Sequence, residues 1–408
     1  MAEGYSITTY KLQLTYRHPE WFQATQALFH QVMSFYYALL QQEDTSVLEL
    51  SNQNLLRHLE QRTIKGRDGK EPEIPLPYAK VPLYFRRAAI NSAIAQARSL
   101  HAQVENWKQN PKGKQPQAPE SPKANMVYYK GMYKDFDREH QSIQLKLYNG
   151  AKWEWETYHF TGRAIPKDGD IMSPTIVQKG KSILLHLPVK TRVQDARTAK
   201  ERAKARERYI TVNLTNSDTL AVCLTTEADG TSHSPLFIKG GKALAHKRRQ
   251  LRGRAKQCEA SGRQKYYDKI TRITDHMAHQ VSRQIVDYAV RQGAKLIVVP
   301  KYSEDFARQG KAFLHQTPFD FIGRRIVTDV TYKAWQQGIV IQPSSIGSNT
   351  KTCALCGEPI KRYNKPGQTP SAVFYGGKNY ICPNGHKGNT ALNTTRNLAQ
   401  SFYESFMR

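Results

Sequence analysis

Three cysteines and one histidine near the C-terminus have the residue types and the spacing of a metal site. Cys353 and Cys356 form a Cys-x2-Cys pair, and Cys382 and His386 follow as Cys-x3-His. Three thiolates and one imidazole are a ligand set for tetrahedral Zn²⁺. Because four protein ligands leave no open position for water or substrate, we expect a structural zinc ion that folds a small domain. Unliganded thiols are the alternative.

The cysteine count and the first residues of the chain indicate in which cellular compartment the protein is expected. The chain has five cysteines in 408 residues, and an odd count fits a metal site better than the disulfide framework of a secreted protein. The sequence contains no run of about 20 apolar residues, so we expect no membrane span. The first residues lack the basic-then-apolar order of a secretory signal. We therefore expect a cytoplasmic protein.

Charge points to the class of partner. Lys and Arg number 61 against 34 Asp and Glu, a formal net charge of +27. Nucleic acid is the polyanion that such a surface fits best, and an anionic membrane is the weaker option because no basic amphipathic anchor stands out. Solvated helix faces are the alternative for any single side chain. The residues that we expect to contact nucleic acid are Arg86, Arg98, Lys247, Arg248, Arg249, Arg252, Arg254 and Lys256.

Hydrophobic periodicity predicts the elements that must position these residues. A strand over 5–16 is followed by helical runs from about residue 19 and again over YFRRAAINSAIAQARSLHAQVENWKQ, and alternating strands return near 140–193. The simplest reading is one β-domain interrupted by helices. A charged connector, QDARTAKERAKARER, leads out of it.

The second half alternates strands and helices. YITVNLT, LAVCLTTE and SPLFIKG predict a three-strand meander, and a long basic helical stretch follows to about residue 292, with a break expected near Gly262. KLIVVP is an all-apolar strand typical of a buried sheet, and a helix and the strand IVIQPSS come after it. This order predicts an α/β sheet.

The order of these motifs resembles a known family. The run from KLIVVP through RRIVTDVTYKAWQQGIVI to CALCG, CPNGH and LNTTRNL resembles the RuvC-like half of compact RNA-guided nucleases, the transposon-encoded TnpB proteins and the type V CRISPR effectors. The match covers about residues 209–408, and the N-terminal half matches only in layout. The resemblance implies a multidomain α+β fold: a wedge-like β-barrel domain (1–18 and 136–205), a helical recognition insertion (19–135), an RNase H-like (RuvC) α/β domain (206–350 and 388–408) and a zinc-ribbon insertion (351–387).

The resemblance also implies a catalytic site, and the chain departs from it. RuvC-like nucleases cut DNA with two Mg²⁺ ions held by three carboxylates. The matching positions in this sequence are Asn213, Pro300 and Ala391. None is acidic, and a proline in place of glutamate indicates natural loss of the nuclease. A hard dication requires anionic oxygen, so we expect a structural zinc ion and no catalytic Mg²⁺ pair.

Nearby acids are the only candidates to replace the lost ligands. Asp218 lies beyond the first strand, Glu304 and Asp305 lie four and five residues past Pro300, and nothing acidic follows Ala391 before Glu404. One relocated acid and neutral amides do not easily hold two metal ions.

The function that the resemblance implies is RNA-guided DNA binding without cleavage. Guide RNA and complementary double-stranded DNA would be the partners, base pairing would read the sequence, and the protein would silence by occupancy or recruit other factors in the prokaryotic cytoplasm and nucleoid. Two alternatives stay open: an active nuclease with relocated carboxylates, and an RNA-binding assembly factor of a transposition complex.

Overall fold

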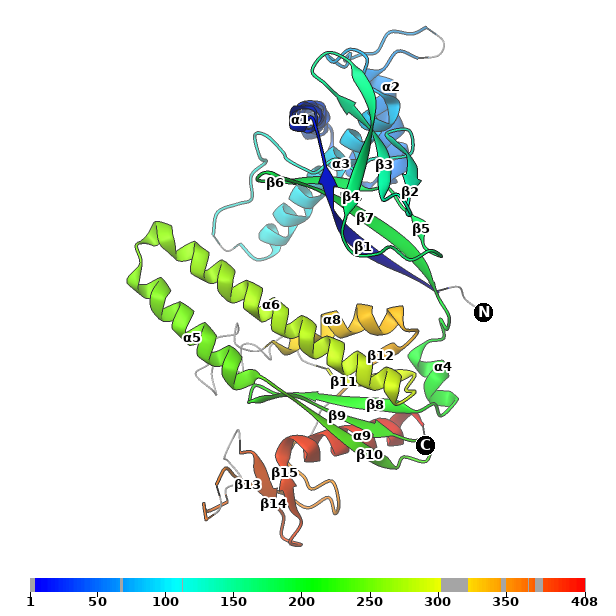
Figure 1. Ribbon diagram of the computed structural model, residues 1–408. Helices are drawn as coiled ribbons and strands as arrows, with labels where there is room; N and C mark the ends of the chain where they lie inside the picture. The colour runs from blue at the N-terminus through cyan, green and yellow to red at the C-terminus, as the bar shows by residue number, and fades with distance from the viewer. Residues whose placement is uncertain are drawn as a thin grey trace. The chain divides into compact units, whose positions relative to one another are not determined.

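The computed structural model describes residues 4–66, 69–111, 113–301, 322–345, 350–365, 367–370 and 377–407. Its contacts divide the chain into two compact units. One is Ile7–Thr191, and the other combines Met1–Ser6 with Arg192–Arg408. The α-helices and strands of both units are labelled in Figure 1.

The unit Ile7–Thr191 combines one sheet with three α-helices and a short 3-10 helix among its described residues. The sheet has the order β2-β3-β4-β1-β7-β5, with β6 paired to β7. Its strands are β1 (Gly4–Thr15), β2 (Tyr133–Asp137), β3 (Ser142–Tyr148), β4 (Trp153–Thr161), β5 (Asp170–Ile171), β6 (Thr175–Lys179) and β7 (Ser182–Val193). The helices, which follow β1 in the chain, are α1 (Pro19–Gln42), η1 (Thr45–Glu49), α2 (Asn52–Thr63) and α3 (Leu83–Gln109).

Strand β3 and helix α1 show why this unit has a single core. Alternate residues of β3, Ile143, Leu145 and Leu147, are fully buried, as the period of a half-buried strand requires. They join one apolar cluster with Phe29 and Met33 of α1. The helices that interrupt the β-domain in sequence therefore share their core with its sheet.

The second unit is built on a mixed five-stranded sheet of order β10-β9-β8-β11-β12. Strands β8, β9 and β10 form the expected antiparallel meander, and β11 runs parallel to β8 and β12. The strands are β8 (Tyr209–Leu214), β9 (Thr219–Thr226), β10 (Ser232–Lys239), β11 (Leu296–Pro300) and β12 (Val340–Ser344). The helices are α4 (Ala199–Lys204), α5 (Gly241–Gln257), α6 (Ala260–Arg291), α8 (Gly323–Gln336) and α9 (Thr390–Phe406).

Both faces of this sheet are covered. Ile210 and Val212 of β8 point into a core shared with α6 and α8. Tyr209, one residue out of step, packs on the opposite face in a core with Leu398 and Phe402 of α9. Figure 1 shows α9 along one side of the sheet and α6 and α8 on the other. The expected mixed α/β architecture, with an all-buried strand at KLIVVP, is confirmed.

A third, small sheet lies between β12 and α9 in the chain. Its antiparallel strands are β13 (Lys361–Tyr363), β14 (Asn379–Ile381) and β15 (Lys387–Asn389). The buried side chains of Ile360 and Tyr380 form a core with Cys353 and Cys382. So small an apolar core implies another source of stability.

The structure refines two of the sequence predictions. The long basic helix breaks at Cys258, whose extended backbone ends α5, and Gly262 lies inside the first turn of α6. The charged connector contains a folded helix, α4, whose Thr198 and Glu201 form a reciprocal capping box. Arg202 of α4 is fully buried and donates to backbone carbonyls, that of Lys295 at 2.7 Å among them.

Candidate functional site

The four metal-ligand candidates converge on one point. The ligand atoms of Cys353, Cys356, Cys382 and His386 all lie within 4.8 Å of one another. Cys356 Sγ lies 3.7 Å from Cys382 Sγ, and Cys382 Sγ lies 3.5 Å from His386 Nδ1. A tetrahedral ion with Zn–S near 2.3 Å and Zn–N near 2.0–2.1 Å holds its ligand atoms about 3.5–3.8 Å apart. The residues therefore fit a zinc ion.

Two tight turns present these ligands. In the first, the Gly357 N–H donates to the Cys353 carbonyl at 2.9 Å, and in the second the Gly385 N–H donates to the Cys382 carbonyl at 3.0 Å. Both glycines have positive φ, 77° and 81°, a backbone conformation that suits glycine. Burial acts to raise the pKa of the Cys353 thiol, but hydrogen bonds from the backbone N–H groups of Leu355 and Cys356 and from the neighbouring thiols together lower that pKa, which favours the thiolate that a metal requires.

The remaining cysteines are separate from this cluster. Cys223 lies in the middle of β9, and burial raises the pKa of its thiol to about 12, so it serves as a core residue. Cys258 is the half-buried residue that ends α5.

Two asparagines of α9 bind the first turn of the cluster. Asn393 accepts from the Ala354 N–H at 2.9 Å and donates to the Thr352 carbonyl at 2.7 Å. Asn397 donates to the same carbonyl at 2.9 Å. In the sequence both asparagines belong to the LNTTRNL motif of the family resemblance. In the structure they fix the Cys353 turn to the start of α9.

The three positions where the resemblance expects carboxylates lie at one edge of the sheet. Asn213 is near the end of β8, Ala391 is the second residue of α9, and the Asn213 Nδ2 donates to the Ala391 carbonyl at 3.1 Å. Strands β8 and β11 pair in parallel up to Thr211 and Val298. Continued by two residues, that register sets Pro300 opposite Asn213 and on the same face of the sheet.

The hydrogen bond to the Ala391 carbonyl determines which type of side chain position 213 accommodates. A carbonyl oxygen only accepts, so the partner on Asn213 must be its amide N–H. A carboxylate has no hydrogen to donate at neutral pH and would face the Ala391 oxygen with a negative charge. Asn213 is 8% exposed, so water replaces little of a lost contact. The geometry thus accommodates an amide and opposes an unliganded carboxylate.

The possible stand-in acids fall into three groups. Glu304 and Asp305 lie outside the described residues. Asp218 is in the turn after β8, where its Oδ1 accepts from the Lys242 backbone N–H at 3.2 Å at the start of α5. Glu404 lies near the far end of α9 and accepts from Gln400 at 3.0 Å.

The basic residues of α5 divide by exposure. Lys247, Arg249, Arg254 and Lys256 are exposed, and Arg252 is half-buried. Arg248 is only 4% exposed, and its Nε and Nη2 lie 3.1 and 3.0 Å from the Thr274 hydroxyl of α6. Arg248 therefore ties α5 to α6, while the exposed members are available to a polyanion.

Arg86 and Arg98 of α3 have protein partners. Arg86 Nη2 lies 3.0 Å from Glu60 Oε1, and only 12% of its side chain is exposed. Arg98 Nε donates to the Leu48 carbonyl at 2.9 Å, and its two Nη groups donate to Asn52 and Leu50. These two guanidinium groups join α3 to α2 and η1.

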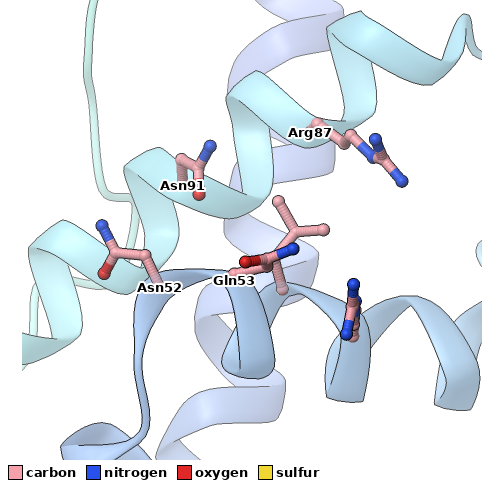
Figure 2. A pocket seen from close by; sticks show the side chains of 6 residues that line it. Asn52, Gln53, Arg87 and Asn91 are labelled. Carbon is pink, nitrogen blue, oxygen red and sulfur yellow. The ribbon is translucent and has the colours of Figure 1, made fainter.

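Sequence reasoning missed a polar pocket between α2 and α3. Figure 2 shows Asn52 and Gln53 on α2 and Arg87 and Asn91 on α3. Arg87 forms a bidentate pair with Glu60, from Nε to Oε1 at 3.2 Å and from Nη2 to Oε2 at 2.9 Å, and Asn91 donates to the Tyr129 hydroxyl at 3.1 Å. Leu56 and Arg57 complete the lining.

None of the described helices has the length and apolar character needed to cross a membrane.

Comparisons with known proteins found one family model and several solved structures that match the chain. The model of the Aq_aa04 family matches residues 6–149. A search of curated proteins found no match. The solved structures that match include a Cas12f1–sgRNA–target DNA complex, at 13% identity and a TM-score of 0.37 over 96% of this chain and 98% of that one.

Two further solved structures match the chain. The mini-RNA-guided endonuclease CRISPR-Cas_phi3 matches at 8% identity and a TM-score of 0.47, over 98% of this chain and 92% of that one. C2c1 of Alicyclobacillus acidoterrestris in complex with single-guide RNA matches at 9% identity and a TM-score of 0.46, over 93% and 69%.

Proposed function

We propose that this protein binds a guide RNA and the complementary target DNA and holds the DNA without cutting it. The observation that carries the proposal is the hydrogen bond from Asn213 to the Ala391 carbonyl. It occupies, with a neutral amide and a backbone oxygen, the place where the family resemblance puts carboxylates and metal ions.

The chemistry of the site supports binding over cleavage. Two-metal cleavage needs anionic ligands that clamp the attacking and leaving oxygens. The side chain of Asn213 offers only a neutral amide oxygen, and those of Ala391 and Pro300 offer no oxygen at all. Within the described part of the chain, Asp218 is the nearest acid along the sequence, and its carboxylate caps α5.

The domain assignment follows from the same proposal. Residues 206–350 and 388–408 would be the RuvC-like domain and 351–387 its zinc ribbon, folded by a zinc ion on Cys353, Cys356, Cys382 and His386. Residues 1–18 and 136–205 would be the wedge, with 19–135 as the recognition helices. The mixed sheet with three matched positions at one edge supports the first of these assignments.

The partners are proposed from charge and from the motif resemblance together. The formal +27 suits a heteroduplex channel that reads backbone shape while base pairing reads sequence. Exposed Lys247, Arg249, Arg254 and Lys256 are the first candidates for heteroduplex contacts. Arg86, Arg98 and Arg248 would act chiefly by holding helices in place.

One assay tests the proposal. The purified protein, with its co-purified RNA, is incubated with a matched supercoiled plasmid and Mg²⁺. A slower-migrating, uncut plasmid is the expected result, and a plasmid without the matching sequence is the control. Nicked or linear product would overturn the proposal in favour of relocated carboxylates at Glu304 or Asp305. RNA binding without guide-dependent DNA binding would instead favour a transposition assembly factor.

Restoring the acids provides a second test. The triple variant Asn213→Asp, Pro300→Glu and Ala391→Asp should cut weakly at most, because a carboxylate at position 213 faces the carbonyl of residue 391. Efficient cutting by that variant would mean that the remainder of a nuclease site is intact.

A further inference from the structure

Asn213, Pro300 and Ala391 form what we call the neutral site, and a basic pocket lies beside it in the unit Arg192–Arg408. We call it the β8–α5 pocket. The turn after β8 lines it on one side and the first half of α5 on another. Its charged side chains, among the described residues, are five cations and one carboxylate: Lys242, Arg248, Arg249, Arg252, Lys378 and Asp218.

The turn and the helix start that form the pocket are tightly joined. The backbone N–H groups of Gly240 and Gly241 both donate to the Asp218 carbonyl at 3.0 Å, and the Asp218 side chain accepts from Lys242 N–H. A Cβ on Gly241 would lie 1.8 Å from the Ser217 carbonyl oxygen, so only glycine permits this approach. The pocket wall is therefore built in advance of any ligand.

Lys378 connects the pocket to the site described above. Its backbone carbonyl accepts from the N–H of Thr390 at 2.8 Å. Thr390 is the residue before Ala391, whose own carbonyl accepts from Asn213. Asn213 in turn lies five residues before Asp218. The pocket is thus joined to the neutral site by the turn that follows β8 and by the backbone hydrogen bond from Thr390 to Lys378.

We propose that the β8–α5 pocket binds backbone phosphate of the target DNA strand, so that Arg and Lys side chains take the charge-neutralising place that metal ions hold in a cleaving relative. This inference rests on the proposed function. Five cations against one capped carboxylate favour a phosphodiester and oppose a divalent cation. Arg249 and Lys378 are both exposed and can reach an incoming strand, while buried Arg248 supports them from below.

The charge of the pocket also predicts how a substitution of Asp218 should change the affinity for DNA. An amide in place of this carboxylate would keep an oxygen for the Lys242 N–H but remove the only negative charge among the described lining residues. The variant Asp218→Asn should therefore bind DNA more tightly, the reverse of what loss of a metal ligand would do.

The test measures guide-dependent DNA binding over a range of salt. In a plot of log affinity against log salt, Arg249→Gln and Lys378→Gln should each lower the slope by about 0.7–0.9, and the double variant by about twice that. Arg291→Gln is the matched control. Arg291 is an exposed arginine at the end of α6, just before the start of β11, whereas the pocket lies beyond the end of β8. Equal slopes for the double variant and the control would overturn the pocket.

A chemical probe locates the phosphate. Target DNAs that each carry one neutral methylphosphonate linkage are bound to the protein in turn. The intact protein should lose affinity at one or two linkages, and the Arg249→Gln, Lys378→Gln variant should be insensitive at those same linkages, since the two changes remove one contact. Sensitivity that persists in the variant would exclude these side chains.

The arms of the experiment separate the possible failures. Binding of the guide RNA alone should be unchanged in the double variant; a loss there would assign the pocket to RNA phosphate and contradict the DNA assignment. If the intact protein shows no guide-dependent DNA binding, the proposed function fails. If it binds and the variants bind equally, only the pocket fails.

Discussion

Substituting Asn213 by aspartate tests the reasoning about the neutral site most directly. The native Nδ2 donates to the Ala391 carbonyl at 3.1 Å in a position that is 8% exposed. The variant Asn213→Asp loses a hydrogen bond and leaves a partly desolvated carboxylate facing a carbonyl oxygen. These two effects together cost about 2–4 kcal/mol in the free energy of unfolding.

The assay is thermal unfolding, with tryptophan fluorescence as the readout. For a unit of this size each kcal/mol lowers Tm by about 2–4 °C, so the variant should melt roughly 5–15 °C lower. Asn213→Ala is the control, because it loses the hydrogen bond without adding charge. Its Tm should lie between those of the native protein and Asn213→Asp. The Ala391 carbonyl keeps another donor, the Thr395 hydroxyl at 2.8 Å.

The pH dependence of the variant has a definite sign. The pKa of the introduced carboxyl is raised in the folded state, because its charged form is disfavoured there. Below the ordinary carboxyl pKa the group is protonated in both states and can donate to the Ala391 oxygen, so the stability penalty disappears. The penalty appears as the pH rises through the ordinary pKa and is complete above the raised folded-state pKa.

Two results would refute the reasoning. The first is a variant as stable as the native protein at neutral pH. The second is stability restored by millimolar Mg²⁺ but not by NaCl of equal ionic strength, since that would mean that the site still binds a hard metal ion.

Three further perturbations have expected outcomes. Purified protein should contain one zinc ion per chain by atomic emission, and Cys382→Ser or a strong chelator should remove it and lower Tm; metal-free native protein would contradict the assignment. Asn393→Ala should lower the free energy of unfolding by about 2–4 kcal/mol in a urea titration, because two buried hydrogen bonds of 2.9 and 2.7 Å are lost, whereas Gln400→Ala on the exposed face of the same helix should change it little. Asp195 has its pKa lowered to about 2 by the Arg197 guanidinium, so its contribution is present above about pH 4 and lost as the pH falls toward 2; exposure of the Arg197 partner limits it to about 1 kcal/mol, and Asp195→Asn should flatten that part of the stability profile measured from pH 2 to 5.

Local sequence patterns predicted the buried strand β11 and the two turns that carry the metal-ligand candidates. KLIVVP is apolar at nearly every position because β11 is covered on both faces, and the Cys-x2-Cys and Cys-x3-His spacings specify two turns that need few other contacts. These signals are short-range, so one sequence reveals them.

Long-range partners were beyond the sequence. Arg86 and Arg98 looked like free cations, but Glu60 and the carbonyls around Leu48 bind them across helices that the sequence cannot place. Arg202 belongs to the charged connector, yet its side chain is fully buried and donates to backbone carbonyls. The β8–α5 pocket likewise joins Lys378 to residues more than a hundred positions earlier.

The two amide side chains of α9 have a consequence for anyone who wishes to shorten this protein. The chain between Ser344 and Thr390 reads as an insertion that a linker might replace. Asn393 is 1% exposed and Asn397 is 8% exposed, and both donate to the Thr352 carbonyl within that insertion. A deletion would take this acceptor away from two buried amides on the helix that covers β8 and β9. Any trimmed version must therefore replace both asparagines with apolar side chains along with the excised segment.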